Sequence, residues 1–432
     1  MDFSDGRVRW RQSRGKTLRI AVCGDTCPAF HGEAEILAGK SPEILAELLP
    51  VLEDADLRIA QWEVVLTRGG TPILKDGPNL KADPGCTAFL KAGRFDAALL
   101  ANNHTGDFGE EGVLSTLAAL RRAGIPSAGA GQNAAAAGKI LRLVRNGFRV
   151  SIVNFCEQEF GCAYGDHAGS NAMDELAIER EIAAEKRRTD ILLVVSHGGN
   201  EHNPVPSPRL MQRSRAFAEA GASAVVNIHQ HCPQGIEVHG NVPIVYSPGN
   251  FFFPHDPADF DPANFWWSGY LPVLTFDRRG ACALEVTPYA QEKEPWRLRV
   301  LTGAQRQWYL DYLTRISAEM LENGGRWFDR WCAYNFAMPL EWFDHMKTAR
   351  LLADPEDAEA LRLLPGPRHM FTCQSHCELV RRLMLLIERR EIAALRRELP
   401  LLQELRTARF AELPPASNAN QCLRMCSMIS SR

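Results

Sequence analysis

The sequence predicts a layered α/β fold followed by a helical C-terminal region. Short apolar runs alternate with helix-like segments between about residues 18 and 253, which is typical of strands joined by crossover helices. From residue 305 onward, Leu, Arg, Glu, Trp and Phe recur with helical periodicity. Of the 432 residues, 45% are hydrophobic and 23% charged, so the chain can bury a globular core, and disordered or fibrous architectures are excluded.

Nine segments have the composition of strands. Most of the first seven are apolar throughout, which indicates strands that are buried on both faces of a sheet. A stretch rich in proline and aromatic residues follows them, and two further strands then complete the α/β region. The predicted strands are residues 18–23, 57–62, 96–101, 149–155, 191–196, 223–228, 243–247, 270–277 and 281–289.

Two helices between the strands have clear end signals. The first is predicted at residues 108–123, where Asp107 is a candidate cap, Glu110 completes a capping box and Gly124 stops the helix. The second runs from about residue 208 to 220 and ends at a glycine. Helices at these places can connect parallel strands.

The change in composition divides the chain into three predicted parts. Residues 17–302 form the α/β domain, residues 303–415 form a helical region, and residues 416–432 form a flexible tail. Within the helical region, residues 305–321 and 379–395 are predicted to be amphipathic helices.

Charge and hydropathy limit the partners and the location. The net charge of -3 gives no overall attraction to nucleic acid or to an anionic membrane, so neither is an expected partner. The first residues contain no apolar core of signal-peptide length, and no stretch reaches the about 20 apolar residues of a membrane span. The twelve cysteines are therefore expected to be thiols, and the cytoplasm is the expected location.

Residues of metal-ligand type follow five predicted strands at or near the strand ends. Sites in α/β sheets form beyond the carboxyl ends of strands, so these side chains can converge although they are far apart in sequence. Six nitrogen and oxygen ligands predict a site for one or two divalent ions, of the Mn, Fe or Zn classes. The candidate ligands are Asp25, Glu63, Asn103, His197, His229 and His231.

Taken singly, these residues also have structural interpretations. Asp25 can be a turn residue or helix cap, Glu63 a solvated strand end, Asn103 a turn former and His197 a structural histidine. Their joint occurrence at five strand ends favours a metal site. In a dinuclear site, a carboxylate such as that of Glu63 bridges the ions, and open positions remain for water and substrate.

Several segments resemble the CapA/PgsA family of bacterial capsule and poly-γ-glutamate synthesis. The segments RIAVCGD, ANNHTGDFG, VVSHGGNEH, VVNIHQH and YSPGNF look like successive family motifs, and the resemblance covers roughly residues 17–300. It implies a four-layer αββα metallophosphatase-like sandwich related to calcineurin-like phosphoesterases.

The resemblance also implies roles for individual residues. It makes Asp25 and His231 ligands of one metal ion, and Asn103, His197 and His229 ligands of the other, with Glu63 as the bridge. The wider phosphoesterase pattern implies that His104 is a general acid or stabilises the transition state. Glu201, Tyr246 and Asn250 match family positions and are candidates to line the site.

The sequence departs from the wider phosphoesterase pattern at the first motif. Cys27 stands two residues after Asp25, where that pattern has a histidine. Cys27 is therefore a candidate metal ligand, although a loop thiol is more often inert. The metal position with Asp25 and His231 is therefore expected to have the lower affinity for its ion.

Three functions are compatible with these features. The first is a hydrolase in which metal-activated water attacks a phosphoester or an amide of an anionic small molecule or polymer, in polysaccharide, polyamide or specialised-metabolite biosynthesis. The second is a non-catalytic accessory protein of capsule or poly-γ-glutamate assembly. The third is assistance in ligation with a partner protein that docks on the helical region. Its aromatic residues are more simply explained by packing onto the main domain: Trp327, Trp331, Trp342 and Phe343.

Overall fold

The protein contains two main sheets that lie face to face. The structure, a computed structural model, describes residues 1–347, 354 and 356–415, so the predicted tail at 416–432 lies outside the described residues. The first sheet has the order β1 (Arg7–Arg9), β18 (Gly280–Glu292), β17 (Ser268–Asp277), β2 (Leu18–Thr26), β3 (Leu57–Trp62), β6 (Ala97–Leu99) and β7 (Ser127–Ala128), with β16 (Asn250–Phe252) on β2 and β19 (Arg297–Val300) on β18. The second has the order β14 (Ile236–His239), β15 (Val242–Val245), β13 (Ala224–Ile228), β12 (Ile191–His197), β10 (Phe148–Cys156) and β9 (Leu141–Arg145).

Each sheet is covered by helices on its outer face. Helices α1 to α5 cover the first sheet: α1 (His31–Leu37), α2 (Ser41–Leu45), α3 (Leu49–Asp54), α4 (Thr87–Ala92) and α5 (Gly109–Ala123). Helices α7 (Glu175–Glu185) and α8 (Pro208–Ala220) pack with the second sheet. Smaller elements complete the domain: β4 (Val65–Leu66), β5 (Lys81–Ala82), β8 (Ala130–Gly131), β11 (Gly169–Ser170), α6 (Ala134–Ala137), and short 3-10 turns at Pro84–Cys86, Pro257–Asp259, Phe265–Trp267 and Arg409–Glu412.

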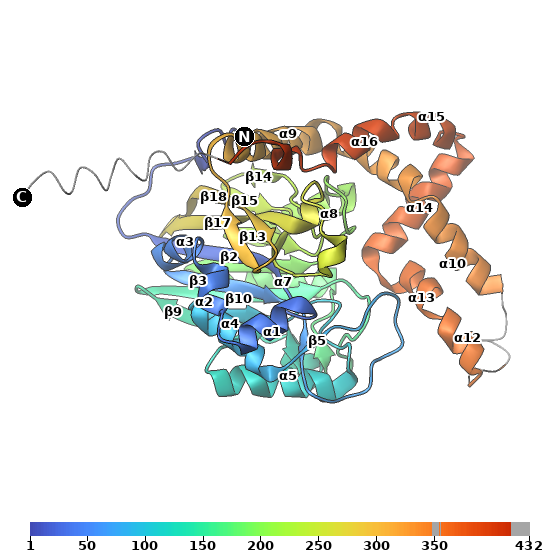
Figure 1. Ribbon diagram of the computed structural model, residues 1–432, viewed down its shortest axis with the longest axis horizontal. Coiled ribbons are helices and arrows are strands. Elements are labelled where there is room, and N and C mark those ends of the chain that lie inside the picture. Colours follow the sequence, from blue (N-terminus) through green and yellow to red (C-terminus); the bar gives the residue numbers. More distant parts are fainter. Residues whose placement is uncertain (348–353, 355, 416–432) are drawn as a thin grey trace, which may run out of the picture.

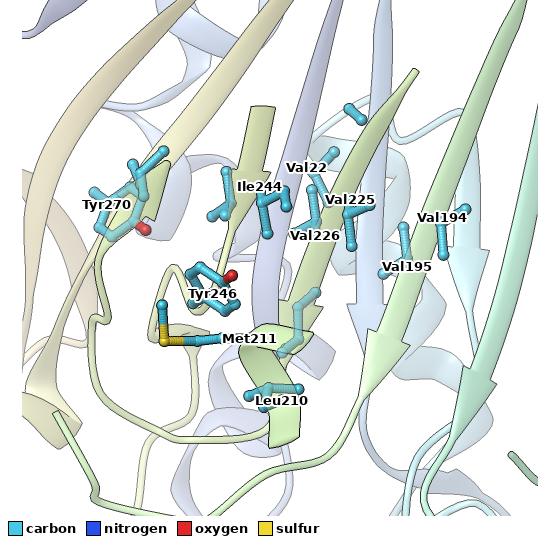
Figure 2. Close-up of a cluster of buried hydrophobic side chains, with 14 of the residues drawn as sticks. Val22, Val194, Val195, Leu210, Met211, Val225, Val226, Ile244, Tyr246 and Tyr270 are labelled. Atoms are coloured by element: carbon cyan, nitrogen blue, oxygen red, sulfur yellow. The ribbon is translucent and has the colours of Figure 1, made fainter. Parts of the chain in front are cut away.

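The alternation of side chains along the strands produces these layers. In β2, Ile20 and Val22 belong to the buried cluster between the two sheets, whereas Ala21 and Cys23 belong to the cluster under the outer helices. Successive side chains of a strand point to opposite faces, so an entirely apolar strand needs a layer on each side. Figure 2 shows Val22 of the first sheet in one cluster with valines of β12 and β13. The four-layer αββα arrangement is thus confirmed.

The C-terminal helices form an arm beside the sandwich (Figure 1). The long helix α9 (Gly303–Tyr334) packs on the sandwich, where its residues Trp327 and Trp331 are buried in the main core. The arm consists of α10 (Ala337–Lys347), α12 (Ala358–Leu363), α13 (Pro365–Thr372) and α14 (Gln374–Glu388), followed by α15 (Ile392–Arg397) and α16 (Leu399–Leu405). Among the described residues, no helix is long and apolar enough to cross a membrane.

Two predictions about helices are wrong in detail. The predicted helix at 379–395 is broken, because α14 ends at Glu388 and Arg390 has a φ of 59° before α15 begins. Helix α5 begins at Gly109, but its N-terminus has no side-chain cap. Asp107 instead accepts hydrogen bonds from Lys75 Nζ and Leu80 N, so tertiary contacts replace the predicted capping bond.

Candidate metal centre

The six predicted ligands lie at one edge of the sandwich. Asp25 lies near the end of β2, Glu63 directly follows β3, and His197 is the last residue of β12. His229 and His231 follow β13, and Asn103 lies in the loop after β6. All six side chains are buried, with exposed fractions of 0–6%. The carboxyl ends of the parallel strands therefore bring together residues that are far apart in the sequence.

Two groups of ligand atoms share one carboxylate. The ligand atoms of Asp25, Glu63 and His197 all lie within 4.8 Å of one another, and so do those of Glu63, His229 and His231. Glu63 belongs to both groups, which is the position expected of a bridging ligand.

Around His197, four candidate ligand residues surround a small space. Its Nε2 atom lies 3.0 Å from Oδ1 of Asn103, 3.0 Å from Nδ1 of His229 and 3.4 Å from Oε1 of Glu63. Ligands about 2.1 Å from one tetrahedral ion are themselves about 3.4 Å apart. These spacings suit a shared divalent cation.

A second set of donors lies around His231. Its Nδ1 atom is 3.5 Å from Oδ2 of Asp25 and 2.8 Å from Oδ1 of Asn250. Asn250 is fully buried at the start of β16 and is paired with Asp25 in the sheet register. Cys27 is in neither ligand group and lies in the apolar cluster under the outer helices. The side-chain oxygen of Asn250 therefore contacts this set, whereas the Cys27 thiol that the sequence suggested belongs to neither ligand group.

Unpaired buried atoms indicate that the centre fits a cation. Both carboxylate oxygens of Asp25, both of Glu63 and Nδ1 of His197 are buried without a hydrogen-bond partner. Burial raises the pKa of Asp25 to about 7 and raises that of Glu63 well above its usual value. Buried charges are normally paired or coordinate metals, and divalent ions at the two ligand groups would satisfy the four carboxylate oxygens.

The loop that carries two of the histidines has an unusual backbone. His229 has a φ of 121° and His231 a φ of 52°. Non-glycine residues in this region cost of order 1–3 kcal/mol each, and such strain is concentrated at functional sites. The strain directs both imidazoles toward the carboxylates from one short loop.

His104 is held by a buried carboxylate and a lysine. Its Nδ1 atom donates to Oδ2 of Asp107 at 2.7 Å, while Lys75 Nζ lies 2.8 Å from Oδ1 of the same carboxylate. This bond leaves Nε2 as the ring nitrogen that is available for chemistry. Burial and the nearby Lys75 lower the pKa of His104, while Asp107 opposes the shift. Sequence reasoning missed Lys75 and misassigned Asp107, although the three-residue spacing from His104 was a usable signal.

Glu159 is a second residue that sequence reasoning missed. Its Oε1 atom lies 3.3 Å from Nε2 of His229, on the side of the ring away from His197. Glu201 Oε1 is more distant from the same nitrogen, at 3.8 Å, and is 45% exposed. Tyr246 lies elsewhere: its ring is among the core side chains of Figure 2, and its hydroxyl donates to Glu237.

A cavity of about 470 Å³ connects the centre with the C-terminal helices. On the sandwich side it is lined by metal-centre residues and loop residues, and on the other side by residues of the helical region. Its lining includes Asn103, His104, Glu159, Glu201 and His229, and, from the helical region, Trp331, Tyr334, Trp342, His369, His376 and Arg406.

Comparisons with known proteins point to one family. The family model described as "Bacterial capsule synthesis protein PGA_cap" matches residues 19–255. The chain is 27% identical over 252 residues to the capsule biosynthesis protein CapA of Bacillus anthracis, covering 56% of this chain and 61% of that protein. It is 29% identical over 221 residues to a Mycobacterium tuberculosis protein named "Probable polyglutamine synthesis accessory protein", covering 47% of this chain and 58% of that protein.

Solved structures give a weaker likeness. A 5'-nucleotidase precursor from Thermus thermophilus has a TM-score of 0.40 and 13% identity, covering 71% of this chain and 59% of that chain. The chain spans about three fifths of the length of the two curated relatives. The family match includes all six predicted ligands.

Proposed function

Since the chain belongs to the bacterial capsule synthesis protein family PGA_cap, we propose that it is a metal-dependent hydrolase of an anionic small molecule or polymer. The bond attacked would be a phosphoester or an amide, and the product would serve the synthesis of a polysaccharide, polyamide or specialised metabolite. The observation that carries the proposal is the buried Glu63, whose two oxygens have no hydrogen-bond partner and whose ligand atom lies within 4.8 Å of those of Asp25, His197, His229 and His231.

In this proposal, Glu63 would contribute to both of two sites for divalent ions of the Mn, Fe or Zn classes. His197, His229 and Asn103 would hold one ion, and Asp25, His231 and Asn250 would hold the other. Bound metal would supply an ionised water near neutral pH and polarise the scissile group. The imidazoles remain neutral as ligands.

His104 acts on the leaving group in the same scheme. With Nδ1 bonded to Asp107, its Nε2 exchanges a proton with the leaving oxygen or nitrogen. When the ring is protonated, Asp107 stabilises the imidazolium and Lys75 keeps Asp107 ionised.

A substrate screen with a matched inactive variant tests the proposal. Chain loaded with Mn²⁺ or Zn²⁺ is assayed on phosphomonoesters, phosphodiesters and γ-glutamyl amides, beside Glu63→Gln and the surface control Glu388→Gln. We expect one class to be hydrolysed by the native chain and by Glu388→Gln, with turnover lost in Glu63→Gln. Hydrolysis that persists in Glu63→Gln would contradict the proposed centre.

The relative named as an accessory protein supports a second candidate, in which the metal domain is a scaffold for polymer assembly. Metal binding without turnover of any substrate class would favour this candidate. Restoration of polymer synthesis in cells by Glu63→Gln as well as by the native chain would favour it further.

A further inference from the structure

Arg406 brings an uncompensated positive charge to the wall of the cavity. It follows α16, and its guanidinium lies 4.6 Å from the ring centroid of Tyr334 and 5.6 Å from that of Trp331. Its Nε atom donates to the carbonyl oxygen of His202 at 3.3 Å. Within the described ranges, no carboxylate lies within ion-pair distance of this guanidinium, and its two terminal nitrogens donate no hydrogen bond.

Four other arginines of the helical region pair with carboxylates. They are Arg315 with Glu404, Arg326 and Arg330 with Glu398, and Arg382 with Asp329. The carboxylates that line the cavity face other groups: Glu159 and Glu201 face His229, and Asp76 faces His369. The two terminal nitrogens of Arg406 can therefore donate to a ligand, while its guanidinium lies against the rings of Tyr334 and Trp331.

A buried histidine on the same cavity wall is also unsatisfied. His369 of α13 is 5% exposed, and neither of its ring nitrogens has a hydrogen-bond partner. Its Nδ1 is 3.7 Å from Asp76 and its Nε2 is 3.9 Å from Glu159, which is beyond hydrogen-bond distance. Burial and the adjacent His376 lower its pKa to about 3, so the ring is neutral and offers one donor and one acceptor. A polar group of a ligand would give both ring nitrogens a hydrogen-bond partner.

The cavity therefore has recognition groups beyond the metal centre. The metal-centre residues Asn103 and His229 line it together with Arg406 and His369. His202, which holds Arg406, follows Glu201, and its ring lies 6.2 Å from that of His231. Arg406 is thus linked to the metal centre through His202, although it belongs to the helical region.

We propose that Arg406 forms a second anion-binding subsite of the cavity, which takes a carboxylate or phosphate carried by the same substrate that reacts at the metals. His369 hydrogen-bonds the polar part of the substrate between its two ends. This inference rests on the proposed function for the position of the reacting group. It assigns the C-terminal helices a role in substrate selection, and the preferred substrate is one with two anionic groups.

Non-hydrolysable phosphonates test the subsite by binding. Calorimetry on the Mn²⁺-loaded full chain compares alkylphosphonates of two to six carbons with the matching ω-carboxyalkylphosphonates and alkylene bisphosphonates. We expect the second anion to lower the dissociation constant about tenfold or more at one or more chain lengths, as for a charge-assisted pair. The carboxylate and bisphosphonate arms decide which anion is preferred. An equal affinity of all three series at every length would overturn the proposal.

Variants locate the effect. In Arg406→Gln the advantage of the second anion should fall to within about twofold, while affinity for the plain alkylphosphonates and the metal content stay unchanged. Arg406→Lys should keep part of the gain in affinity from the second anion. Arg409→Gln, on the neighbouring exposed turn, should keep the whole gain. If Arg406→Gln retains the advantage, Arg406 is not the subsite; if that variant does not fold, the native comparison and Arg406→Lys decide.

Turnover of the matching phosphate esters is measured separately. Anion preference without turnover would leave the subsite standing and defeat hydrolysis as the function. Turnover without a preference for the second anion would support hydrolysis as the function and overturn the subsite. Failure of every phosphonate to bind the metal-loaded chain would overturn both.

Discussion

The carboxylate of Glu159 lies 3.3 Å from Nε2 of His229, while Nδ1 of the same ring faces His197 across the metal centre. A ring that coordinates through one nitrogen and donates through the other is fixed in tautomer and orientation. Burial lowers the pKa of His229, but Glu159, with smaller contributions from Glu201 and Asp25, raises it to about 9. The other oxygen of Glu159 faces His369, so one carboxylate stands between the metal centre and the helical region.

We expect Glu159→Gln to weaken metal binding about 10- to 100-fold, because the carboxylate no longer orients and polarises His229. The measurement is a titration of metal-free chain with Mn²⁺ or Zn²⁺. Glu201→Gln is the matched control and should have a smaller effect, since Glu201 is farther from His229 and half-exposed. Equal effects of the two variants would contradict the role given to Glu159.

The second prediction concerns the two metal positions. The Asp25 position has one imidazole, that of His231, whereas the other position has those of His197 and His229, so we expect the Asp25 position to bind its ion more weakly. Titration of metal-free chain should show two unequal steps, with activity on the second. Asn250→Ala should weaken the second step about tenfold or more, whereas Cys27→Ser should leave it unchanged. A loss of the second step in Cys27→Ser alone would restore the thiol as the ligand.

The strands could be predicted because their burial on both faces leaves a simple pattern. Residues 191–195 are entirely apolar and residues 57–62 are mostly apolar, and the structure has strands at both places. The side chains that follow them then converge for a topological reason, since parallel strands end at one edge. This is why most of the candidate ligands are together in the structure.

Tertiary contacts explain what the sequence did not reveal. Glu159 comes from a loop, and its distance from His229 depends on how β10 and β13 sit in one sheet. Asp107 satisfies the local pattern of a helix cap, but Lys75 and His104 bind its carboxylate instead. At Arg390 the helical periodicity continues although the backbone turns away. A local sequence pattern does not show which distant residues compete for the same side chain.

The third prediction tests the pair formed by His104 and Asp107. We expect His104→Ala to reduce kcat about 10²- to 10⁴-fold and to leave the metal content unchanged, because His104 contributes proton transfer. Asp107→Asn should reduce kcat in the same direction, since the amide cannot stabilise the imidazolium. Metal analysis and steady-state kinetics are made on the same samples. Loss of the metal in His104→Ala, with full rate in metal excess, would contradict the assignment.

The fourth prediction concerns stability at a site far from the metals. Asp277 is buried, accepts a bidentate pair from Arg11, and also accepts from the backbone nitrogens of Arg14 and Arg279. These bonds, first that of Arg11, hold the pKa of Asp277 well below its usual value. The carboxylate therefore stabilises the fold above the unfolded pKa of about 3.9, and this contribution is lost as the pH falls toward the lower, folded value.

Arg11→Ala should accordingly lower the free energy of unfolding by about 1–3 kcal/mol at pH 7. The difference from the native chain should shrink below about pH 4, because Asp277 without Arg11 takes up its proton in the folded variant at a higher pH than in the folded native chain. Chemical denaturation between pH 3 and 7 measures both. Arg68→Ala removes a mostly exposed ion pair with Asp83 and should cost about 0.5 kcal/mol or less. A constant difference across this pH range would show that Arg11 acts through packing alone.

The last prediction concerns how the helical region is attached to the sandwich. Glu157 is buried at the end of β10, and its oxygens accept from Ser375 N at 2.9 Å and Ser375 Oγ at 3.0 Å at the start of α14, as well as from Arg209. We expect Glu157→Gln to destabilise the contact by about 1–3 kcal/mol, because a charged acceptor of several donors becomes neutral. Hydrogen exchange should then rise in α13 and α14 and stay unchanged in the strands β12 and β13. The exposed Glu388→Gln on the same helix should change neither, so equal protection of α14 in Glu157→Gln and the native chain would mean that other contacts hold the region in place.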